Sequence, residues 1–245
     1  MTEPERSVTG LVPREAIRQV ELPPIDPAIV GRYLQLDDLT AAVSDAMDNF
    51  GLAGAIDALA LRPSLPGQRV VGQAVTVRNA ERTESPAKAA QGRKNLMGEF
   101  EAYHLSKPGN VIVIEGLTGV SNMGGQSATL AFQAKCAGAI IDGSHRDPGR
   151  SKELGFPIWS RGVTPITGKW RLRTIEINGS VRIAGVQVDA GDLVIADDAG
   201  VVFVPLRHVE EVLVEAERIG AGDGRQKQDI AAGIDLALLA SRKYK

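Results

Sequence analysis

The chain has 245 residues, of which 43% are hydrophobic and 24% charged, and its formal net charge is −2. This composition is ordinary for a globular protein and allows one large domain or two small ones. The small net charge gives no electrostatic reason to expect binding to nucleic acid or to an anionic membrane surface. The single cysteine, Cys136, excludes an internal disulfide framework, and we expect it to be a small core residue.

The N-terminal segment shows no targeting signal. Its first residues mix charges and lack the apolar run of a signal peptide, and nowhere do about 18 apolar residues follow one another. We therefore expect a cytoplasmic protein with no membrane partner. Residues 1–26 are rich in proline and charge, which predicts an N-terminal arm outside the core, followed by a single domain over residues 27–245.

Downstream of the arm, hydrophobic patterning predicts alternating helices and strands. Asp26 and Pro27 form a plausible helix start. Expected helices cover residues 37–47, 95–105, 126–136, 206–219 and 225–241, with a break at the glycines of 220–224. Expected strands cover residues 70–79, 109–116 and 138–143, and several short strands lie between 157 and 205. A polar stretch, residues 80–94, interrupts the pattern.

Strands first connected by helices and then by short turns indicate an α/β fold with mixed sheets and outer helices. A plain doubly wound nucleotide-binding sheet is disfavoured, because the last third of the chain has many short strands and few helices between them. The chain also contains neither a G-x-G-x-x-G helix start after a strand nor a Walker lysine motif.

The first candidate binding element is the glycine-rich segment before the 126–136 helix. Gly124, Gly125, Gln126 and Ser127 stand where the free amides of a first helical turn bind an anion. The alternative is an ordinary glycine-rich turn that Ser121 or Asn122 caps.

The second candidate is the loop GSHRDPGR, directly after a strand expected to be buried. Arg146 can hold a carboxylate with two hydrogen bonds, and Asp147 offers hard oxygen ligands to Mg²⁺ or Mn²⁺. Alone, the pair is equally compatible with a surface ion pair worth under about 1 kcal/mol. If both loops end at one sheet edge, they suit a small 2-oxo acid that chelates a metal.

These motifs, in this order, are similar to the RraA-like family, which contains class II pyruvate aldolases acting on 4-hydroxy-4-methyl-2-oxoglutarate and 4-carboxy-4-hydroxy-2-oxoadipate, and regulators of ribonuclease activity. The resemblance covers roughly residues 37–240. It rests on LTAAVSDAM (39–47), GQAVTV (72–77), the glycine-rich helix start, GAIIDGSHRD (138–147), ELGFPIWSRGVTP (153–165) and GDLVIADDAGVVFVP (191–205).

The resemblance implies a swivelling β/β/α fold, assembled as a homotrimer or as a hexamer of two trimers with sites at subunit interfaces. It implies that Arg146 holds the 2-oxo acid and that Asp147 binds the divalent metal, most simply Mg²⁺. It also implies that the amides of Gln126 and Ser127 hold the substrate carboxylate.

One position departs from the pattern of the aldolases. They carry an aspartate 21 residues before the arginine, where it orients a metal-bound water, and this chain has Gly125 there. As substitutes for proton transfer we consider His145 and Glu115. A further acidic residue reaches the metal of a neighbouring subunit in the family, and Asp223 is the candidate for that role.

The resulting prediction is a metal-dependent lyase that cleaves a 4-hydroxy-2-oxo acid. Decarboxylation of oxaloacetate is a less demanding reaction through the same enolate. Two alternatives remain: a non-catalytic regulator that binds a protein partner, and a lyase or isomerase of a sugar acid. The second is suggested by Gly125 and by the basic side chains of the 80–94 segment. These are Arg82, Lys88, Arg93 and Lys94.

Overall fold

A long strand, β3 (Val70–Glu81), forms the centre of the fold in the computed structural model, which describes residues 8–19 and 21–244. The first eight residues of β3 are buried, as its valine-rich sequence predicts. Parallel strands β4 (Val111–Glu115), β5 (Gly138–His145) and β6 (Ile158–Val163) continue the sheet on one side.

Antiparallel strands complete this sheet, which has nine strands in the part of the chain that the structure describes. Its order is β1–β11–β10–β3–β4–β5–β6–β2, and β7 pairs with the second half of β3. A separate hairpin, β8–β9, lies beside it. The remaining bounds are β1 (Ala55–Asp57), β2 (Arg62–Pro63), β7 (Leu172–Ile177), β8 (Val181–Ile183), β9 (Val186–Val188), β10 (Leu193–Asp197) and β11 (Gly200–Val204).

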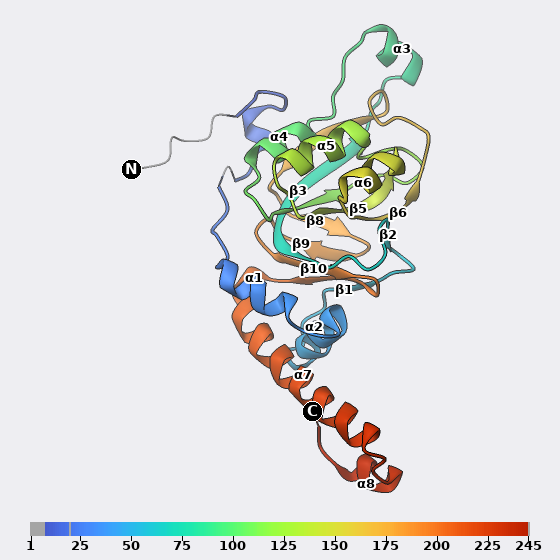
Figure 1. The fold of residues 1–245 in the computed structure, drawn as a ribbon. Helices are drawn as coiled ribbons and strands as arrows, with labels where there is room; N and C mark the ends of the chain where they lie inside the picture. Colours follow the sequence, from blue (N-terminus) through green and yellow to red (C-terminus); the bar gives the residue numbers. More distant parts are fainter. Residues whose placement is uncertain (1–7, 20, 245) are drawn as a thin grey trace.

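Helices cover the strands on two sides (Figure 1). One group packs above the parallel strands: α4 (Glu99–Leu105), α5 (Gly125–Gln133) and α6 (Pro148–Leu154). A second group lies beneath β10 and β11: α1 (Pro27–Leu34), α2 (Leu39–Asn49) and α7 (Val209–Ala231). The short helices α3 (Pro86–Gln91) and α8 (Leu236–Ser241) protrude at opposite ends of the molecule. As predicted, Asp26 caps α1, since its carboxylate accepts a hydrogen bond from the Ala28 amide.

Three hydrophobic clusters correspond to these layers. One joins the parallel strands to α4 and α5 and includes Ile112, Ile141 and Tyr103. Another joins α1, α2 and α7 to β10 and β11. The third fills the space between the main sheet and the β8–β9 hairpin and contains Trp159. The predicted α/β class with mixed sheets and outer helices is confirmed.

The order β4–α5–β5–α6–β6 positions the candidate site. Each helix connects two parallel strands, so the loops that follow β4 and β5 emerge at the same edge of the sheet. Hydrogen bonds lock these loops together: the Asn122 amide donates to the Ser144 carbonyl at 2.8 Å, and the Arg146 amide donates to the Met123 carbonyl at 2.9 Å. The two predicted binding elements are therefore neighbours.

The predicted N-terminal arm needs correction where it is described. Val12 and Ile17 are buried in the cluster beneath α4, so this part of the arm belongs to the core. A buried carboxylate, Glu101, holds the segment, because the amide of Thr9 donates to it at 2.8 Å. Proline-rich composition predicted an exposed arm, but buried apolar side chains and the hydrogen bond to Glu101 hold this part of it against the domain. Residues 1–7, including Pro4, lie outside the described residues.

The predicted break at residues 220–224 is also wrong. Helix α7 continues through the three glycines of this segment. Glycine costs only about 1 kcal/mol in a helix interior, which the buried face of α7 outweighs through Leu213, Ala216 and Ile219. Among residues 8–19 and 21–244, no helix is both long and apolar enough to span a membrane.

Gly72 provides a test of the packing between β3 and β4. A Cβ at this position would overlap the carbonyl oxygen of Gly109, which is backbone and cannot easily move. We expect Gly72→Ala to lower the free energy of unfolding by about 1–3 kcal/mol, the usual cost of overpacking. Urea-induced unfolding measures this change.

Gly220→Ala is the matched control. A Cβ at Gly220 would meet no atom within 4 Å, and the residue is helical. We expect this variant to gain up to about 1 kcal/mol from helix propensity. Equal stability of the two variants would contradict the close approach of β3 to the turn before β4.

Candidate functional site

A cavity of about 450 Å³ lies at the sheet edge where the loops after β4 and β5 meet. Its wall contains the predicted binding residues Gly124–Ser127, Arg146 and Asp147. The structure thus brings together two sequence elements about twenty residues apart. The other residues of the wall are Asn95, Met97, Glu99, Phe100, Ser121, Thr167, Gly168 and Lys169.

Asp147 lies between the two elements. Its backbone is in the left-handed region, with φ 60° and ψ 53°, which is uncommon for residues other than glycine. Although it immediately precedes α6, its side chain does not cap that helix. Instead its Oδ2 accepts a hydrogen bond from the Gly125 amide at 3.0 Å, at the start of α5. The carboxylate therefore faces the positive end of α5, where a negative charge is stabilised.

Arg146 shares the cavity with this carboxylate. Its Nε lies 3.3 Å from Asp147 Oδ2, and the two side chains are 36% and 48% exposed. Such exposure leaves the guanidinium accessible to a ligand, and the remaining N–H groups of an arginine suit a carboxylate. The first-turn amides of a helix lack intrahelical acceptors, so the amides of Gln126 and Ser127 add further donors. The arrangement is suited to binding a small anion.

The geometry around Gly125 gives a physical reason for the absence of an aspartate there. A Cβ on Gly125 would lie 3.1 Å from Cβ of Arg150 and 3.2 Å from Cβ of Asp147. Helix α6 therefore packs against α5 so closely that a carboxylate side chain at position 125 would require a shift of α6. The acidic group expected in the aldolases cannot be supplied from this position without repacking.

Sequence reasoning missed the most unusual residue of the cavity, Glu99. This glutamate begins α4 and is only 4% exposed. Ser127 Oγ donates a hydrogen bond to its Oε1 at 3.1 Å, while its Oε2 is buried without a hydrogen-bond partner among the described residues. Burial raises the pKa of Glu99 to about 6, and the hydrogen bond from Ser127 offsets only part of this shift.

A sequence signal for Glu99 did exist. The residue shares a helical face with Ala102 and Tyr103, three and four positions later, and both of these are buried. A carboxylate on the apolar face of a helix indicates either a special partner or a functional role. Lys169 was also missed. It lies at the cavity wall and stacks over the Trp170 ring, with Nζ 4.6 Å from the ring centroid.

The two predicted proton-transfer substitutes lie elsewhere. His145 is the last residue of β5 and is buried, with Nδ1 2.9 Å from Ser160 Oγ. Burial lowers the pKa of His145, and the side chain is not part of the cavity wall. Its neighbour Arg146 faces the cavity instead, because successive residues of an extended segment point to opposite sides.

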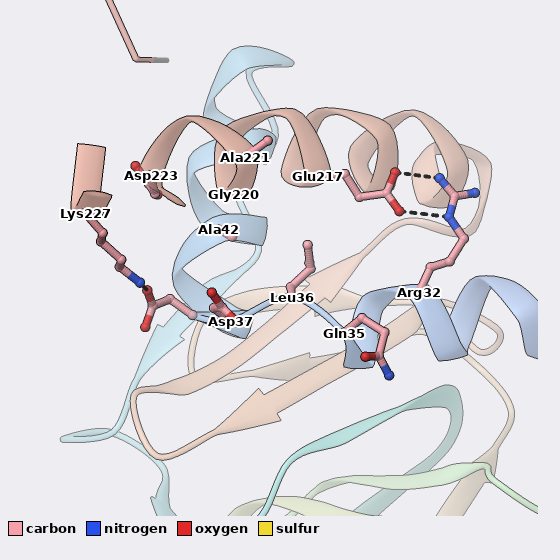
Figure 2. Close-up of a pocket in the computed structure, with 11 residues that line it drawn as sticks. Arg32, Gln35, Leu36, Asp37, Ala42, Glu217, Gly220, Ala221, Asp223 and Lys227 are labelled. Carbon is pink, nitrogen blue, oxygen red and sulfur yellow. Dashed lines mark hydrogen bonds and ion pairs between the residues drawn. The ribbon is translucent and has the colours of Figure 1, made fainter. Parts of the chain in front are cut away.

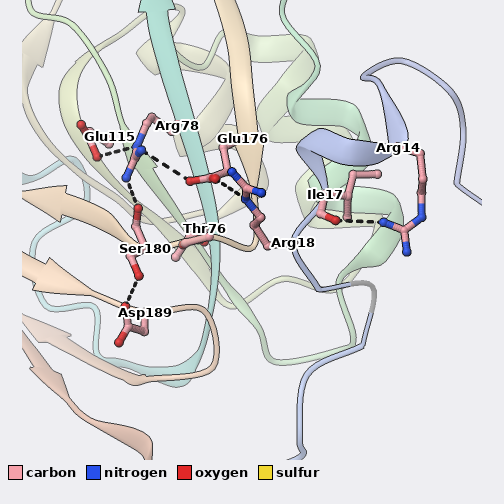
Figure 3. Close-up of polar contacts among 10 residues, drawn as sticks. Arg14, Ile17, Arg18, Thr76, Arg78, Glu115, Glu176, Ser180 and Asp189 are labelled. Carbon is pink, nitrogen blue, oxygen red and sulfur yellow. Dashed lines mark hydrogen bonds and ion pairs between the residues drawn. The ribbon is translucent and has the colours of Figure 1, made fainter.

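Glu115 is held in a group of polar contacts with Arg78 (Figure 3). Its Oε2 lies 3.2 Å from Nε of Arg78 and accepts a hydrogen bond from the Arg182 amide at 2.8 Å. Arg78 in turn contacts Glu176, which also pairs with Arg18 of the N-terminal segment. Glu115 thus belongs to a charge network that joins β3, β4, β7 and β8, and it does not line the cavity.

Asp223 belongs to α7, and this helix lies on the opposite side of the sheet from α5 (Figure 1). It lines a different pocket, of about 440 Å³, between α1, α2 and α7. Figure 2 shows this pocket, with the Arg32–Glu217 ion pair at one end and Asp223 and Lys227 at the other. Within one chain, Asp223 is therefore remote from Asp147. The role expected for it concerns a neighbouring subunit and stays a prediction.

The polar 80–94 segment forms a projection that contains α3 (Figure 1). Arg82 is directed inward, where it contacts Glu84 and donates to the Lys94 carbonyl at 2.7 Å. Lys88 lies within 4.0 Å of Glu84. Arg82 and Lys88 thus contact the segment itself, and none of residues 80–94 lines the cavity that contains Arg146.

Metal-ligating side chains are sparse within one chain. In the described ranges, no group of three or more His, Cys, Asp or Glu residues is arranged to hold a metal ion. Cys136 is buried and free, as expected for a small core residue, and burial raises its pKa to about 11.

Comparison with known proteins agrees with this architecture. The model of the RraA-like family, described as Aldolase/RraA, matches residues 40–203, which is more than half of the chain. The chain therefore belongs to the RraA-like family.

Its relatives carry different names. A protein of Halalkalibacterium halodurans called "Putative 4-hydroxy-4-methyl-2-oxoglutarate aldolase" is 30% identical over 207 residues, covering 84% of this chain and 89% of that protein. Protein DlpA of Legionella pneumophila is 27% identical over 199 residues, or 80% of this chain. The match spans only 31% of DlpA, so this chain corresponds to about a third of that relative.

Two solved structures share the fold over most of their length. An uncharacterized protein from Pseudomonas syringae pv. tomato has a TM-score of 0.75 and 26% identity, covering 90% of this chain and 96% of that one. RraAS2 of Streptomyces coelicolor, described as an unusual member of the RNase ES inhibitor RraA protein family, has a TM-score of 0.65 and 25% identity. The match covers 86% of this chain and 98% of the RraAS2 chain.

The burial of Glu99 predicts a pH-dependent effect on stability. Since the folded chain holds the Glu99 proton more tightly than the unfolded chain, this residue weakens the fold as the pH rises from about 4.5 through about 6. Glu99→Gln stays neutral. We expect it to raise the free energy of unfolding by about 2 kcal/mol at pH 8 and to change it little at pH 4.

Urea unfolding of both proteins at several pH values measures this difference. Glu101→Gln, in the same helix, is the control for loss of a buried carboxylate that is hydrogen-bonded to Thr9. A gain for Glu99→Gln that is the same at every pH would contradict the raised pKa.

Proposed function

We propose that this protein is a divalent-metal-dependent lyase that cleaves 4-hydroxy-2-oxo acids to pyruvate or a related 2-oxo acid and a carbonyl compound. The observation that carries the proposal is the shared cavity. A guanidinium, a half-exposed carboxylate and the start of a helix surround a space of about 450 Å³, which is large enough for such a substrate.

Arg146 and the amides of Gln126 and Ser127 would bind the carboxylate and the 2-oxo group. Their roles follow from position, because all three residues line the cavity beside the first turn of α5. A helix start and a guanidinium on the same ligand place two independent sources of positive potential around an anion. This geometry favours a compact dianion over a neutral sugar.

The side chains present are compatible with Mg²⁺. This ion typically takes one or two protein carboxylates and keeps waters or substrate oxygens in its other positions. Asp147 offers such a carboxylate at the cavity wall, with only its Oδ2 engaged by Gly125 and Arg146. Bound there, Mg²⁺ or Mn²⁺ would supply Lewis-acid polarisation of the 2-oxo group. Asp147 would hold the ion.

Cleavage between C3 and C4 leaves negative charge on the enolate of the 2-oxo acid. Arg146 is placed to stabilise this charge, since the same guanidinium that binds the ground-state oxygen lies against the developing anion. Oxaloacetate decarboxylation produces the same enolate without removing a hydroxyl proton. We therefore propose it as a second activity of the same site.

Assembly into a homotrimer or hexamer is part of this proposal. Apolar side chains near the C-terminus support it, because Ile230, Leu236 and Leu238 are 59%, 79% and 48% exposed in the single chain. In such an assembly, Asp223 would approach the metal of a neighbouring copy. Light scattering of the purified protein measures the oligomeric state.

Substitution of Arg146 tests the proposal directly. We expect Arg146→Ala to lower kcat/KM by about 10²–10³-fold, both for cleavage of 4-hydroxy-4-methyl-2-oxoglutarate and for decarboxylation of oxaloacetate, because enolate stabilisation is lost. Pyruvate release with added Mg²⁺ is followed by coupling to lactate dehydrogenase. Circular dichroism verifies the fold.

Arg150→Ala provides the matched control. Arg150 belongs to α6, contacts Thr129 and Glu153, and does not line the cavity. Full activity of Arg146→Ala would remove the central assignment. Absence of metal-dependent turnover in the wild type would instead favour a non-catalytic regulator that binds a protein partner.

A further inference from the structure

Glu99 is a buried carboxyl group that is in contact with the candidate active-site cavity. It is 4% exposed, yet it lines the same cavity as Arg146 and Asp147. Its Oε1 accepts the hydrogen bond from Ser127, and its Oε2 lacks a hydrogen-bond partner in the described part of the chain. One carboxylate oxygen is thus fixed by α5 while the other has no protein group to bind.

A purely structural role does not explain this carboxyl. Within residues 8–19 and 21–244, no Lys, Arg or His nitrogen forms an ion pair with Glu99. The nearby titratable group is the Tyr103 hydroxyl on the same helix, which is also buried, and across the cavity wall are Arg146, Asp147 and Lys169. A buried, unpaired carboxylate costs stability, and a glutamine could accept the same hydrogen bond from Ser127 without this cost.

Among the described residues of the cavity wall, the other carboxylate is Asp147, which is proposed to hold the metal. Position 125 is a glycine at which an aspartate would require a shift of the adjacent residues Asp147 and Arg150, and the side chains of His145 and Glu115 are directed elsewhere. Cleavage of a 4-hydroxy-2-oxo acid requires a group that removes the hydroxyl proton. Glu99 lines the cavity together with Gly125 and Ser127 of α5.

We propose that Glu99 is the proton acceptor for the C4 hydroxyl of the substrate, so that α4 supplies the proton-transfer group that position 125 lacks. This inference rests on the proposed lyase function. Ser127 is a positioning residue, because its hydroxyl fixes Oε1 and leaves Oε2 without a hydrogen-bond partner among the described residues.

Glu99 Oε2 takes the proton of the C4 hydroxyl, and the electron pair of that O–H bond becomes the second bond of the product carbonyl. The C3–C4 bond breaks, and its electron pair passes into the enolate that Arg146 stabilises. The enolate takes a proton at C3 from solvent, and Glu99 releases its proton to solvent.

The pKa of about 6 fits this role. A base with a pKa just below neutral is ionised at pH 7 and still accepts a proton more readily than an ordinary glutamate. Below about pH 6 the carboxyl is protonated and cannot act as the base. The rate of cleavage is therefore expected to fall as the pH falls through this value.

Glu99→Gln separates the two reactions proposed for this site. We expect kcat/KM for cleavage of 4-hydroxy-4-methyl-2-oxoglutarate to fall by about 10²–10⁴-fold and the fall in rate below pH 6 to disappear. Decarboxylation of oxaloacetate should be retained, because that substrate loses no hydroxyl proton. Binding of oxalate with Mg²⁺, measured by calorimetry, should also be retained.

Glu101→Gln is the matched control, because Glu101 is buried in the same helix but contacts Thr9 outside the cavity. It should leave both reactions unchanged. Cleavage by Glu99→Gln at the wild-type rate, or equal loss of cleavage, decarboxylation and oxalate binding, would overturn the assignment. If the wild type catalysed neither reaction, the lyase function would fail, and the role of Glu99 would fail with it.

Discussion

The hydrogen bond from the Gly125 amide to the Asp147 carboxylate is the contact on which the candidate site depends. It joins the loop after β4 to the loop after β5, and it requires Asp147 to adopt a left-handed backbone conformation. That conformation costs about 1 kcal/mol for an ordinary residue. This conformation places the carboxylate against the positive end of α5 and beside the Arg146 guanidinium. Asp147 makes this contact instead of capping its own helix, α6.

The cavity contains two carboxyl groups in opposite environments. Asp147 is half exposed and lies beside the Arg146 guanidinium. Glu99 is buried beside a serine hydroxyl, and burial penalises its charge. In many active sites, two carboxyl groups in different environments have different roles. One stabilises charge, and the other transfers a proton. Packing of the core around α4 offsets the unfavourable free energy of burying Glu99. The same helix also fixes the N-terminal segment through Glu101.

Much of this arrangement could be predicted from the sequence. Arg146, Asp147 and residues 124–127 follow consecutive buried strands, and parallel connections bring such loops together whatever the details of packing. Glu99 and Lys169 could not be placed in this way, because they reach the cavity from α4 and from the loop after β6, whose positions depend on tertiary packing. Composition also predicted that Val12 and Ile17 lie in an arm outside the core, although both are buried. The glycines of α7 predict a break because their propensity cost is visible in the sequence, whereas the compensating burial of Ile219 is not.

The environment of Gly125 links the sequence departure to the architecture. With no side chain at that position, α6 approaches α5 until Arg150 and Asp147 occupy the space that an aspartate would need. An acidic side chain at position 125 would therefore require α6 to move slightly away from α5 in this chain. A chain that keeps the tight packing must obtain any acid–base group from another wall of the cavity. The wall formed by α4 contains the carboxyl of Glu99, and the first turn of this helix is anchored twice, by Ser127 through Glu99 and by Thr9 through Glu101.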